Sequence, residues 1–413
     1  MPVNTPIASS TLPNGLRMVY LPSTSAVSYC GLAIHAGTRD EPSEQSGLAH
    51  FVEHMLFKGT AKRKSWHILN RMESVGGELN AYTTKEETFL YTICLAGDTE
   101  RAIELLSDLA FHSQFPETEI DRERDVILDE IRSYEDNPSE AIADEFENLL
   151  FAGSEMGHLI LGNETSLRTI TSATCRSFTG TFYHPENMVF FFYGKTPWPE
   201  IIRLAGKYLG EIPKGGVQGM QRKRIEPKPV EPEQKTITKD LHQSHVMVGS
   251  RGYGLHEDKR IGLFLLNNLL GGPGMNSRLN ISLREKRGLV YTVDSITTSY
   301  TDTGVFNIYF GCDRESVQQC LRLMDKELRK LRDQSLSSLQ LNASIKQLKG
   351  QMGISNDHRE NVALGLGKSF LHYNKYNTLP EMYAKLDTLT PSLLLEIANE
   401  VFDEKQLFRL IFE

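Results

Sequence analysis

Residues 47–57 have the sequence GLAHFVEHMLF, an apolar segment that carries three ionisable side chains. Its apolar content predicts a buried helix, on which His50 and His54, four positions apart, direct their imidazoles from one face. Glu53 lies beside that face. Burying its carboxylate among apolar side chains without a charge partner would cost several kcal/mol, and a divalent cation removes that cost. The segment therefore favours a metal site, although ordinary core or surface histidines and a Glu53–lysine pair also fit these residues.

A zinc site that supports hydrolysis needs a third protein ligand and one open position for water. The best source of that ligand is the helix predicted over residues 117–135, on which Glu123, Ile127 and Glu130 share one face at i, i+4 and i+7. Both glutamates therefore belong to the half-buried side. The other acidic residues of this segment are expected on its solvated face: Asp121, Asp125 and Asp129. Spacing alone leaves the choice between the two glutamates open.

The two halves of the chain are predicted to contain a similar order of elements. In the first half, strands are expected over residues 16–21, 28–35, 78–83 and 88–95, and helices over 46–58, 66–75, from 99 and over 117–135. In the second half, strands are expected over 234–240, 244–249, 290–297 and 304–310, and helices over 259–270, 277–286, 314–332 and 337–352. Asp98 and Asp313 occupy matching strand-to-helix junctions and are expected to cap the following helix. This order predicts an α+β fold of two structurally similar halves, each a sheet covered by helices.

Residues 213–234 form the clearest break in composition. They contain two adjacent glycines, a basic cluster over residues 222–224 and three closely spaced prolines. Proline at this density favours extended chain and prevents a helix. We therefore expect a linker between a domain of residues 1–212 and a domain of residues 235–413. A solvated linker explains the basic cluster better than a nucleic-acid or targeting patch does.

Composition excludes several classes of protein. A length of 413 residues suggests two or three domains, and 39% hydrophobic with 24% charged residues argues against a mainly disordered chain. The densest apolar run, residues 189–193, is too short to span a membrane, and residues 1–10 lack the pattern of a secretory signal. Five cysteines without a close pair argue against a disulfide framework and for a reducing compartment. The net charge of −8 argues against a nucleic-acid partner and mildly favours basic ligands. We expect a cytoplasmic protein with no nucleic-acid or membrane partner.

Together with the metal-site segment, three other motifs along the chain form a pattern that is typical of one protein family. The H-x-x-E-H of residues 50–54, followed by Glu123 and Glu130 in an E-x-x-x-x-x-x-E arrangement, resembles the inverzincin metallopeptidases related to pitrilysin, insulysin and the mitochondrial processing peptidases. Residues 76–83 (GGELNAYT) and 283–291 (LREKRGLVY) match further family segments. The resemblance covers nearly the whole chain and points to the short bacterial two-domain members that resemble processing peptidases.

The resemblance implies that His50, His54 and Glu130 bind one zinc ion per chain. Glu53 would be the general base, which takes the proton of a zinc-held water as that water attacks the peptide carbonyl. Glu123 would orient a histidine ligand through its other ring nitrogen. The alternative for Glu123 is a salt bridge with one of two nearby basic residues, Arg124 or Lys58.

The resemblance also assigns residues to substrate binding. The strand over residues 78–83 would hold an extended peptide by adding it to a sheet edge, with Asn80 supplying a side-chain contact and Ala81 a main-chain contact. Closing the preceding glycine turn is the structural alternative for Asn80. In the second half, Arg284 would grip the substrate backbone or a carboxylate, and the Tyr291 hydroxyl would stabilise the developing oxyanion. Without the family pattern, these two would be a surface helix residue and a strand aromatic.

These roles predict a zinc metalloendopeptidase that hydrolyses peptides or unfolded segments in an enclosed chamber. Residues 1–212 would be the catalytic zinc-binding domain, and residues 235–413 would complete the substrate site. A chain that carries both the zinc motif and the Arg–Tyr pair is expected to form a homodimer. Two other interpretations stay open: a noncatalytic peptide-binding or scaffold relative, and the catalytic subunit of a heterodimeric processing peptidase.

Overall fold

The apolar run MVFFFYG forms β6 (Met188–Gly194), a strand whose residues are all buried. Phe190 and Phe192 belong to the hydrophobic cluster on one face of the sheet, whereas Val189 and Phe191 belong to a separate cluster on the other face. Because successive side chains of a strand point to opposite faces, a strand without a polar face requires a covering layer on each side. The computed structural model, which describes residues 7–215, 224 and 226–413, contains both layers.

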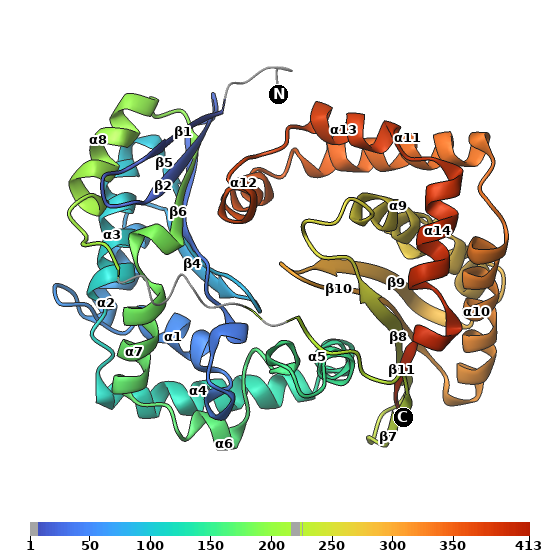
Figure 1. Ribbon diagram of the computed structural model, residues 1–413. Coiled ribbons are helices and arrows are strands. Elements are labelled where there is room, and N and C mark those ends of the chain that lie inside the picture. Colours follow the sequence, from blue (N-terminus) through green and yellow to red (C-terminus); the bar gives the residue numbers. More distant parts are fainter. Residues whose placement is uncertain (1–6, 216–223, 225) are drawn as a thin grey trace. The chain divides into compact units, whose positions relative to one another are not determined.

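β6 lies within the six-stranded sheet of the first of two compact units (Figure 1). The strand order is β1-β2-β6-β3-β5-β4, in which β2 and β6 are parallel and the other neighbouring pairs are antiparallel. The remaining strands of this sheet are β1 (Ala8–Thr11), β2 (Arg17–Pro22), β3 (Val27–Ile34), β4 (Glu78–Thr83) and β5 (Thr88–Leu95). β4 is thus an edge strand, with Asn80 opposite Tyr91 of β5.

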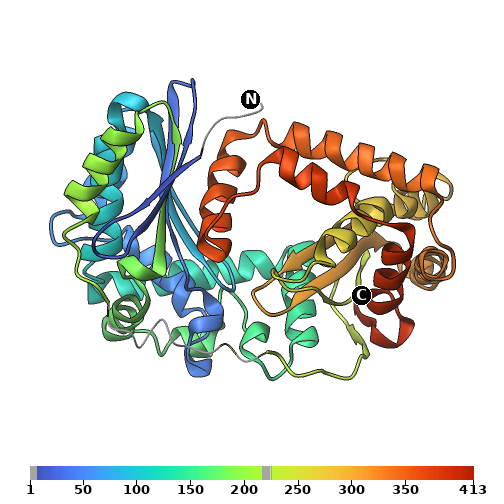
Figure 2. The same cartoon turned by 45° about the horizontal axis from the view of Figure 1, so that its top comes forward.

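Helices cover both faces of the first sheet. Those on one face come from the first half of the chain: α1 (Leu48–Leu56), α2 (Ser65–Glu73), α3 (Thr99–His112), α7 (Ser172–Phe182) and α8 (Trp198–Leu209). The opposite face is covered by α12 (Arg359–Tyr373), the red-orange helix that lies against this sheet in Figure 2. Its Val362, Leu366 and Phe370 join the apolar side chains of the strands. α12 follows the linker in sequence, so the second half of the chain supplies one layer of the first unit.

The second unit contains a five-stranded sheet of order β7-β11-β8-β10-β9. Its strands are β7 (Gln234–Ile237), β8 (Ser244–Gly252), β9 (Val290–Ser299), β10 (Gly304–Cys312) and β11 (Phe408–Phe412). β11 is parallel to β7 and antiparallel to β8, and the pairs β8–β10 and β10–β9 are antiparallel. In chain order, β7 to β11 therefore repeat the connections and strand directions of β2 to β6.

The helical layers of the second unit follow the same plan. One face carries α9 (Arg260–Gly271), α10 (Val317–Asp333), α11 (Ser338–Ser355), α13 (Leu379–Asp387) and α14 (Pro391–Val401). The other face is covered by α5 (Pro138–Leu150), whose Ile142 and Phe146 pack with Met247, Leu410 and Phe412. Here the first half of the chain supplies the layer. The predicted α+β fold of two similar sheet-plus-helices halves is confirmed.

The compact units are not contiguous in sequence. The first consists of residues 1–131, 158–223 and 356–377, and the second of residues 132–157, 224–355 and 378–413. They differ from the contiguous domains expected over residues 1–212 and 235–413 by the two exchanged segments that contain α5 and α12. The reason is physical, because each sheet needs a cover on its second face. Most of the predicted basic cluster in the linker lies outside the described residues.

The helix expected over residues 277–286 is present, and its turns at Asn280–Glu285 are those of a π-helix. One local prediction is wrong. Asp98 and Asp313 do stand at the starts of helical segments, but neither carboxylate accepts a capping hydrogen bond. Within the described residues, we find no helix with the length and apolar character needed to cross a membrane.

Candidate metal centre

Helix α1 is held in the core of the first unit by its apolar residues, and its first turn is anchored by a buried carboxylate. Gly47 begins the helix with a φ of 93°, and a Cβ there would lie 2.7 Å from the carbonyl oxygen of Leu161, so glycine is required. Glu41, which is 1% exposed, accepts hydrogen bonds from the backbone N–H groups of Gly47 at 2.9 Å and Ala49 at 2.7 Å. It thereby satisfies donors that a helix N-terminus leaves unpaired.

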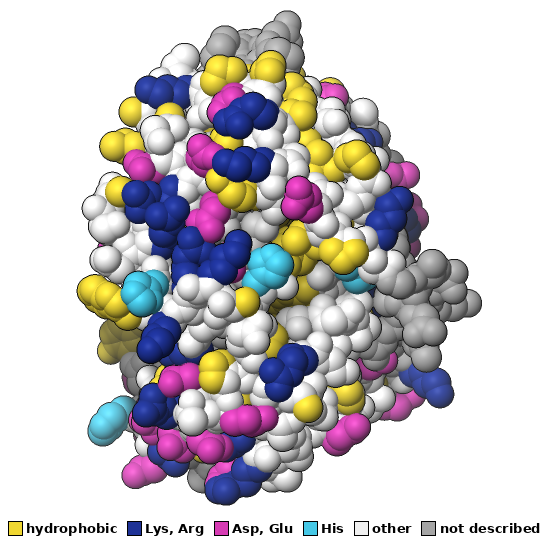
Figure 3. Space-filling view, turned by 90° about the vertical axis from the view of Figure 1, so that its left-hand side faces the viewer, with side chains coloured by type: hydrophobic (Ala, Val, Ile, Leu, Met, Phe, Trp, Pro, Cys, Tyr) yellow, Lys and Arg dark blue, Asp and Glu magenta, His cyan; other side chains and the backbone are white. Residues whose placement is uncertain are grey.

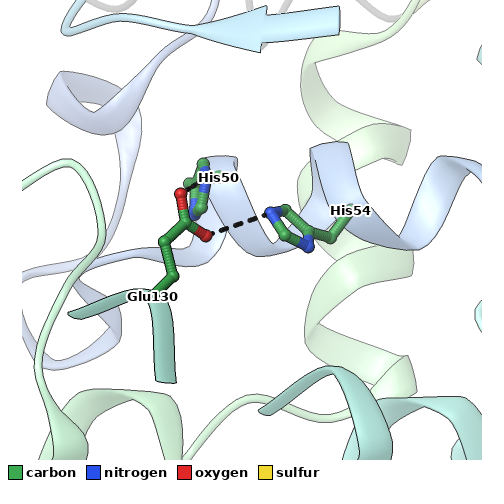
Figure 4. A group of neighbouring side chains, drawn as sticks. All are labelled: His50, His54 and Glu130. Carbon is green, nitrogen blue, oxygen red and sulfur yellow. Dashed lines mark ion pairs between the residues drawn. The ribbon is translucent and has the colours of Figure 1, made fainter. Parts of the chain in front are cut away.

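The predicted ligands converge (Figure 4). His50 and His54 project from α1, and Glu130 reaches them from α4 (Glu117–Glu135). Glu130 Oε1 lies 3.9 Å from His50 Nε2, and Glu130 Oε2 lies 3.5 Å from His54 Nε2. The donor atoms of these three side chains all lie within 4.8 Å of one another. No other group of this kind occurs among the described residues.

This donor set fits zinc. Zn²⁺ takes imidazole nitrogens and carboxylate oxygens at about 2.0–2.2 Å in a tetrahedral arrangement, which separates neighbouring donors by about 3.3–3.5 Å. The 3.5 and 3.9 Å separations from Glu130 to His54 and His50 are close to that value. Three protein donors also leave a fourth position for water or substrate. His50, His54 and Glu130 are therefore suited to hold one zinc ion.

Glu123 makes both contacts that the sequence left as alternatives, one to a histidine ligand and one to a lysine. It lies on the same face of α4 as Ile127 and Glu130, one and two turns before them. Its Oε2 lies 3.2 Å from Nδ1 of His54, and its Oε1 lies 2.6 Å from Nζ of Lys58. With the proton on Nδ1 donated to Glu123, Nε2 of His54 faces Glu130 as a lone-pair donor. The expected salt bridge to Lys58 is thus present together with the histidine contact.

Glu53 is held close to the metal ligands without being one of them. The hydroxyl of Thr83, at the end of β4, donates a hydrogen bond of 2.6 Å to Glu53 Oε2. Burial raises the pKa of Glu53, while the Thr83 hydrogen bond and the neighbouring His54 oppose the rise. A carboxylate whose pKa is raised by burial is a better proton acceptor than an exposed one.

The two histidines have opposite protonation tendencies. Burial, together with the neighbouring His54, lowers the pKa of His50 to about 4. Burial also acts to lower the pKa of His54, but its hydrogen bonds to Glu123 and Glu130 outweigh that effect and raise the value to about 9. The His54 hydrogen bond lowers the pKa of Glu130. A metal ion at this cluster would therefore compete with a proton on His54, so metal affinity falls as the pH is lowered.

The predicted substrate strand is accessible at the sheet edge. Asn80 and Ala81 lie in β4, half-buried and next to only one neighbouring strand, β5. Among the described residues, the Asn80 side chain has no hydrogen-bond partner, and the turn after α2 is closed by backbone bonds from Gly76 and Gly77. Nothing in this arrangement assigns Asn80 to turn closure.

Arg284 and Tyr291 belong to the second compact unit. Arg284 lies in the π-helix and is exposed, and Tyr291 lies in β9 with 72% of its surface exposed. β9 is also an edge strand, in which both Tyr291 and the following Thr292 are exposed. The proposed roles of this pair stay predictions.

Sequence reasoning missed two residues that contact the centre or its helix: Thr83 as the partner of Glu53 and Glu41 as the anchor of α1. Thr83 was included only as the last residue of a substrate strand. No spacing rule connects it to Glu53, because the contact joins a strand end to a helix 30 positions earlier. Residues 39–41 are all charged, but no spacing in the sequence connects Glu41 with the start of α1.

Comparisons with known proteins agree with this fold. Residues 17–164 match the family model described as Insulinase (Peptidase family M16), and residues 169–348 match the model described as Peptidase M16 inactive domain. A Bacillus subtilis protein named as the uncharacterized zinc protease YmxG is 31% identical over 404 residues, which cover 97% of each chain. The chain belongs to peptidase family M16. The resemblance seen in the sequence motifs is thereby confirmed.

Other M16 members are similarly close. An uncharacterized zinc protease of Streptomyces coelicolor is 30% identical over 414 residues, covering 98% of this chain and 89% of its own. The bovine mitochondrial-processing peptidase subunit beta is 30% identical over 404 residues, covering 95% of this chain and 81% of its own.

Two solved structures share the M16 architecture. A protease from Helicobacter pylori superposes with a TM-score of 0.89 at 22% identity, over 99% of both chains. A Pseudomonas fluorescens structure described as a peptidase M16 inactive domain gives a TM-score of 0.91 at 20% identity, over 98% of this chain and 97% of that one. At these identities the likeness shows the fold alone.

Proposed function

We propose that this M16 chain is a zinc-dependent endopeptidase that hydrolyses peptides or unfolded segments. The observation that supports the proposal best is the convergence of His50, His54 and Glu130 on one point beside the carboxylate of Glu53. The names of the relatives as zinc proteases and as a processing peptidase subunit agree with it. One zinc ion per chain would be held by the two histidines and Glu130.

The bound zinc would supply Lewis acidity, which acidifies a water and polarises the peptide carbonyl. The chain's own residues then have distinct tasks. Glu53 accepts the proton that the water loses and later delivers it to the leaving amine. Thr83 holds the Glu53 carboxylate in place through the 2.6 Å hydrogen bond. Glu123 fixes the His54 ring so that Nε2 faces the metal position.

Substrate binding would use the free edge of β4. An extended peptide added there would gain main-chain hydrogen bonds from the strand, Ala81 among them, with little demand on its sequence. Asn80 would add a side-chain contact, because its amide has no hydrogen-bond partner among the described residues. Arg284 is proposed to grip the peptide and Tyr291 to stabilise the oxyanion.

Assembly follows the same proposal. We expect a homodimer, because one chain carries both the zinc motif and the Arg–Tyr pair. We also expect the protein in the cytoplasm, because five cysteines without a close pair point to a reducing compartment. The likeness to a processing peptidase subunit favours a heterodimer as the second candidate. Activity of the purified chain alone supports the homodimer, and activity only after addition of a second, different chain supports the heterodimer.

The deciding experiment replaces Glu53 by glutamine. Glu53→Gln removes the proton acceptor but keeps the size of the side chain, so we expect cleavage of a quenched fluorescent peptide to be lost while zinc content, measured by atomic emission, is retained. Glu73→Gln, at an exposed position of α2, is the matched control and should keep full turnover. Unchanged turnover in Glu53→Gln refutes the mechanism. A wild-type chain that binds zinc but cleaves no peptide in a mixed pool supports the noncatalytic interpretation.

A further inference from the structure

The outer surface of the first unit carries a basic groove that shares no residue with the metal centre. The groove has a volume of about 350 Å³ and lies where the segment before α2, α2 itself and the start of α3 meet. Its lining residues are Lys62, Arg63, His67, Asn70, Arg71, Ser74 and Arg101. Figure 3 views the side of the unit that carries α2 and α3, and shows Lys and Arg side chains gathered at its middle beside histidines. Each lining side chain can donate a hydrogen bond, and none is a carboxylate.

Three guanidinium groups of the α2 groove are held in fixed orientations. Arg63 donates to both oxygens of Glu104, at 2.8 and 2.7 Å, and to Asp108 at 2.5 Å. Arg71 contacts the same Glu104 at 3.3 Å, and Arg101 donates to the backbone oxygen of Arg71 at 3.0 Å. The side chains of Glu104 and Asp108 are only 15% and 1% exposed, so the carboxylates lie behind the cations. The groove is therefore preorganised, which lowers the entropy lost when a ligand binds.

Other donors of the groove have no structural task. Among the described residues, the side chains of Lys62, His67, Asn70 and Ser74 have no hydrogen-bond or ion-pair partner, and all four are exposed. The network that fixes α2 on α3 consists of Arg63, Arg71 and Arg101 and uses none of these four side chains. The four unpaired donors beside three fixed guanidinium groups are arranged as a binding surface.

The charge of the groove selects an anionic ligand. Four permanent cations line it, and the three carboxylates that pair with them are Glu104, Asp108 and Asp98, which leaves an excess of one positive charge among the lysine and arginine side chains. The chain as a whole carries a net charge of −8. A local positive surface on an acidic protein attracts an acidic partner and directs it to that place.

An apolar surface lies next to the basic one. Trp66 and Leu69, which are 67% and 50% exposed, occupy the adjoining face of α2, one helical turn apart. An exposed tryptophan beside charged donors is typical of protein-binding surfaces. It also favours a peptide over a small free anion, because only the peptide has apolar side chains that could pack against it. We propose that the α2 groove, with Trp66 and Leu69, binds an acidic peptide segment of a partner protein that carries glutamate or aspartate next to an apolar side chain.

The binding test uses the full chain with Glu53→Gln, so that the probe stays intact. The probe is a fluorescein-labelled peptide rich in glutamate and containing leucine, followed by anisotropy and by the fluorescence of Trp66, one of only two tryptophans in the chain. We expect saturable binding that weakens with added salt, and a change in tryptophan emission that Trp66→Phe abolishes. A counterpart peptide with lysine in place of glutamate should not bind.

The matched variants are Lys62→Glu combined with His67→Glu, and Lys326→Glu on α10 as the control. Within the described part of the chain, the side chains of Lys62 and His67 have no hydrogen-bond or ion-pair partner, so the double variant should keep the wild-type melting temperature while binding the acidic peptide at least about tenfold more weakly. Lys326 is also exposed but lies in the second compact unit, outside the α2 groove, and its replacement should not change the binding. Equal binding by the double variant and the control overturns the proposal. So does tighter binding of an RNA oligonucleotide than of the peptide, or a loss of self-association in the double variant without added peptide.

Discussion

Replacing Thr83 by valine tests whether the strand that ends beside the metal centre also positions the general base. Valine keeps the branched shape of threonine but removes the hydroxyl that donates to Glu53 Oε2 at 2.6 Å. A hydrogen bond to a charged group contributes about 1.5–3 kcal/mol. If the bond holds Glu53 in its reactive orientation, its loss lowers kcat/KM by roughly 10- to 150-fold, since each 1.4 kcal/mol corresponds to about a factor of ten. The loss should appear mainly in kcat, because β4 keeps its backbone donors for the peptide.

The pH dependence gives a second measure of the same contact. A general base works only when deprotonated, and the Thr83 hydrogen bond acts to lower the pKa of Glu53 against the effect of burial. In Thr83→Val the acidic limb of the kcat/KM profile should therefore move to higher pH. The assay is cleavage of a quenched peptide across a pH series, with zinc content checked for each variant. Thr83→Ser restores the hydroxyl and should restore the activity. A valine variant with wild-type kcat and an unshifted limb refutes the reasoning.

Three further predictions concern the surroundings of the centre. Glu123→Gln removes the charged acceptor of His54 Nδ1, and zinc affinity measured against a competing chelator should fall about 10- to 100-fold; an unchanged affinity would mean that the Lys58 salt bridge is its main role. Glu41→Gln weakens the anchor of α1, and the free energy of unfolding measured in urea should fall by about 1–2 kcal/mol, whereas a stability equal to wild type would show the anchor to be dispensable. Burial acts to raise the pKa of Glu87, but His372 and Lys368 of α12 outweigh that effect and lower the pKa to about 2. The difference from the ordinary pKa of 4.5 corresponds to about 3 kcal/mol of stability above pH 4.5, and this stability is lost as the pH falls toward 2. Glu87→Gln should therefore be less stable than wild type at pH 7 and equal to it near pH 2, and a difference that persists at acid pH would contradict this linkage.

Local patterns predicted the elements of this fold well, because period and flanking turn residues act within a few positions. β4 (Glu78–Thr83), β5 (Thr88–Leu95) and α4 (Glu117–Glu135) have the bounds expected from the sequence. The acidic face of α4 is solvated, and Glu123 and Ile127 are buried as their spacing indicated. Val126, an apolar residue next to this buried face, is 49% exposed. The solvated face of α4 is wider than the apolar pattern suggested.

What the spacing of residues could not decide was any contact between distant segments. That Glu130 meets His50 and His54 was implied by family resemblance, because two carboxylates on one face of α4 are equivalent in sequence. The two carboxylates differ only in their tertiary contacts. Glu123 lies at Nδ1 of His54, next to Lys58, and Glu130 lies at Nε2 of the same ring. The Thr83 contact to Glu53 has the same origin.

The sequence by itself determined the helix that pairs two imidazoles, the strand over residues 78–83 and the repeated order of elements, since all of these depend on interactions between near neighbours. The tertiary structure alone decided which glutamate faces the imidazoles, which hydroxyl holds the base, and which helices complete each sheet. α5 and α12 each cover a sheet built mainly by the other half of the chain. A sheet with two apolar faces must be covered on both sides, but the rule does not specify which segment provides the cover.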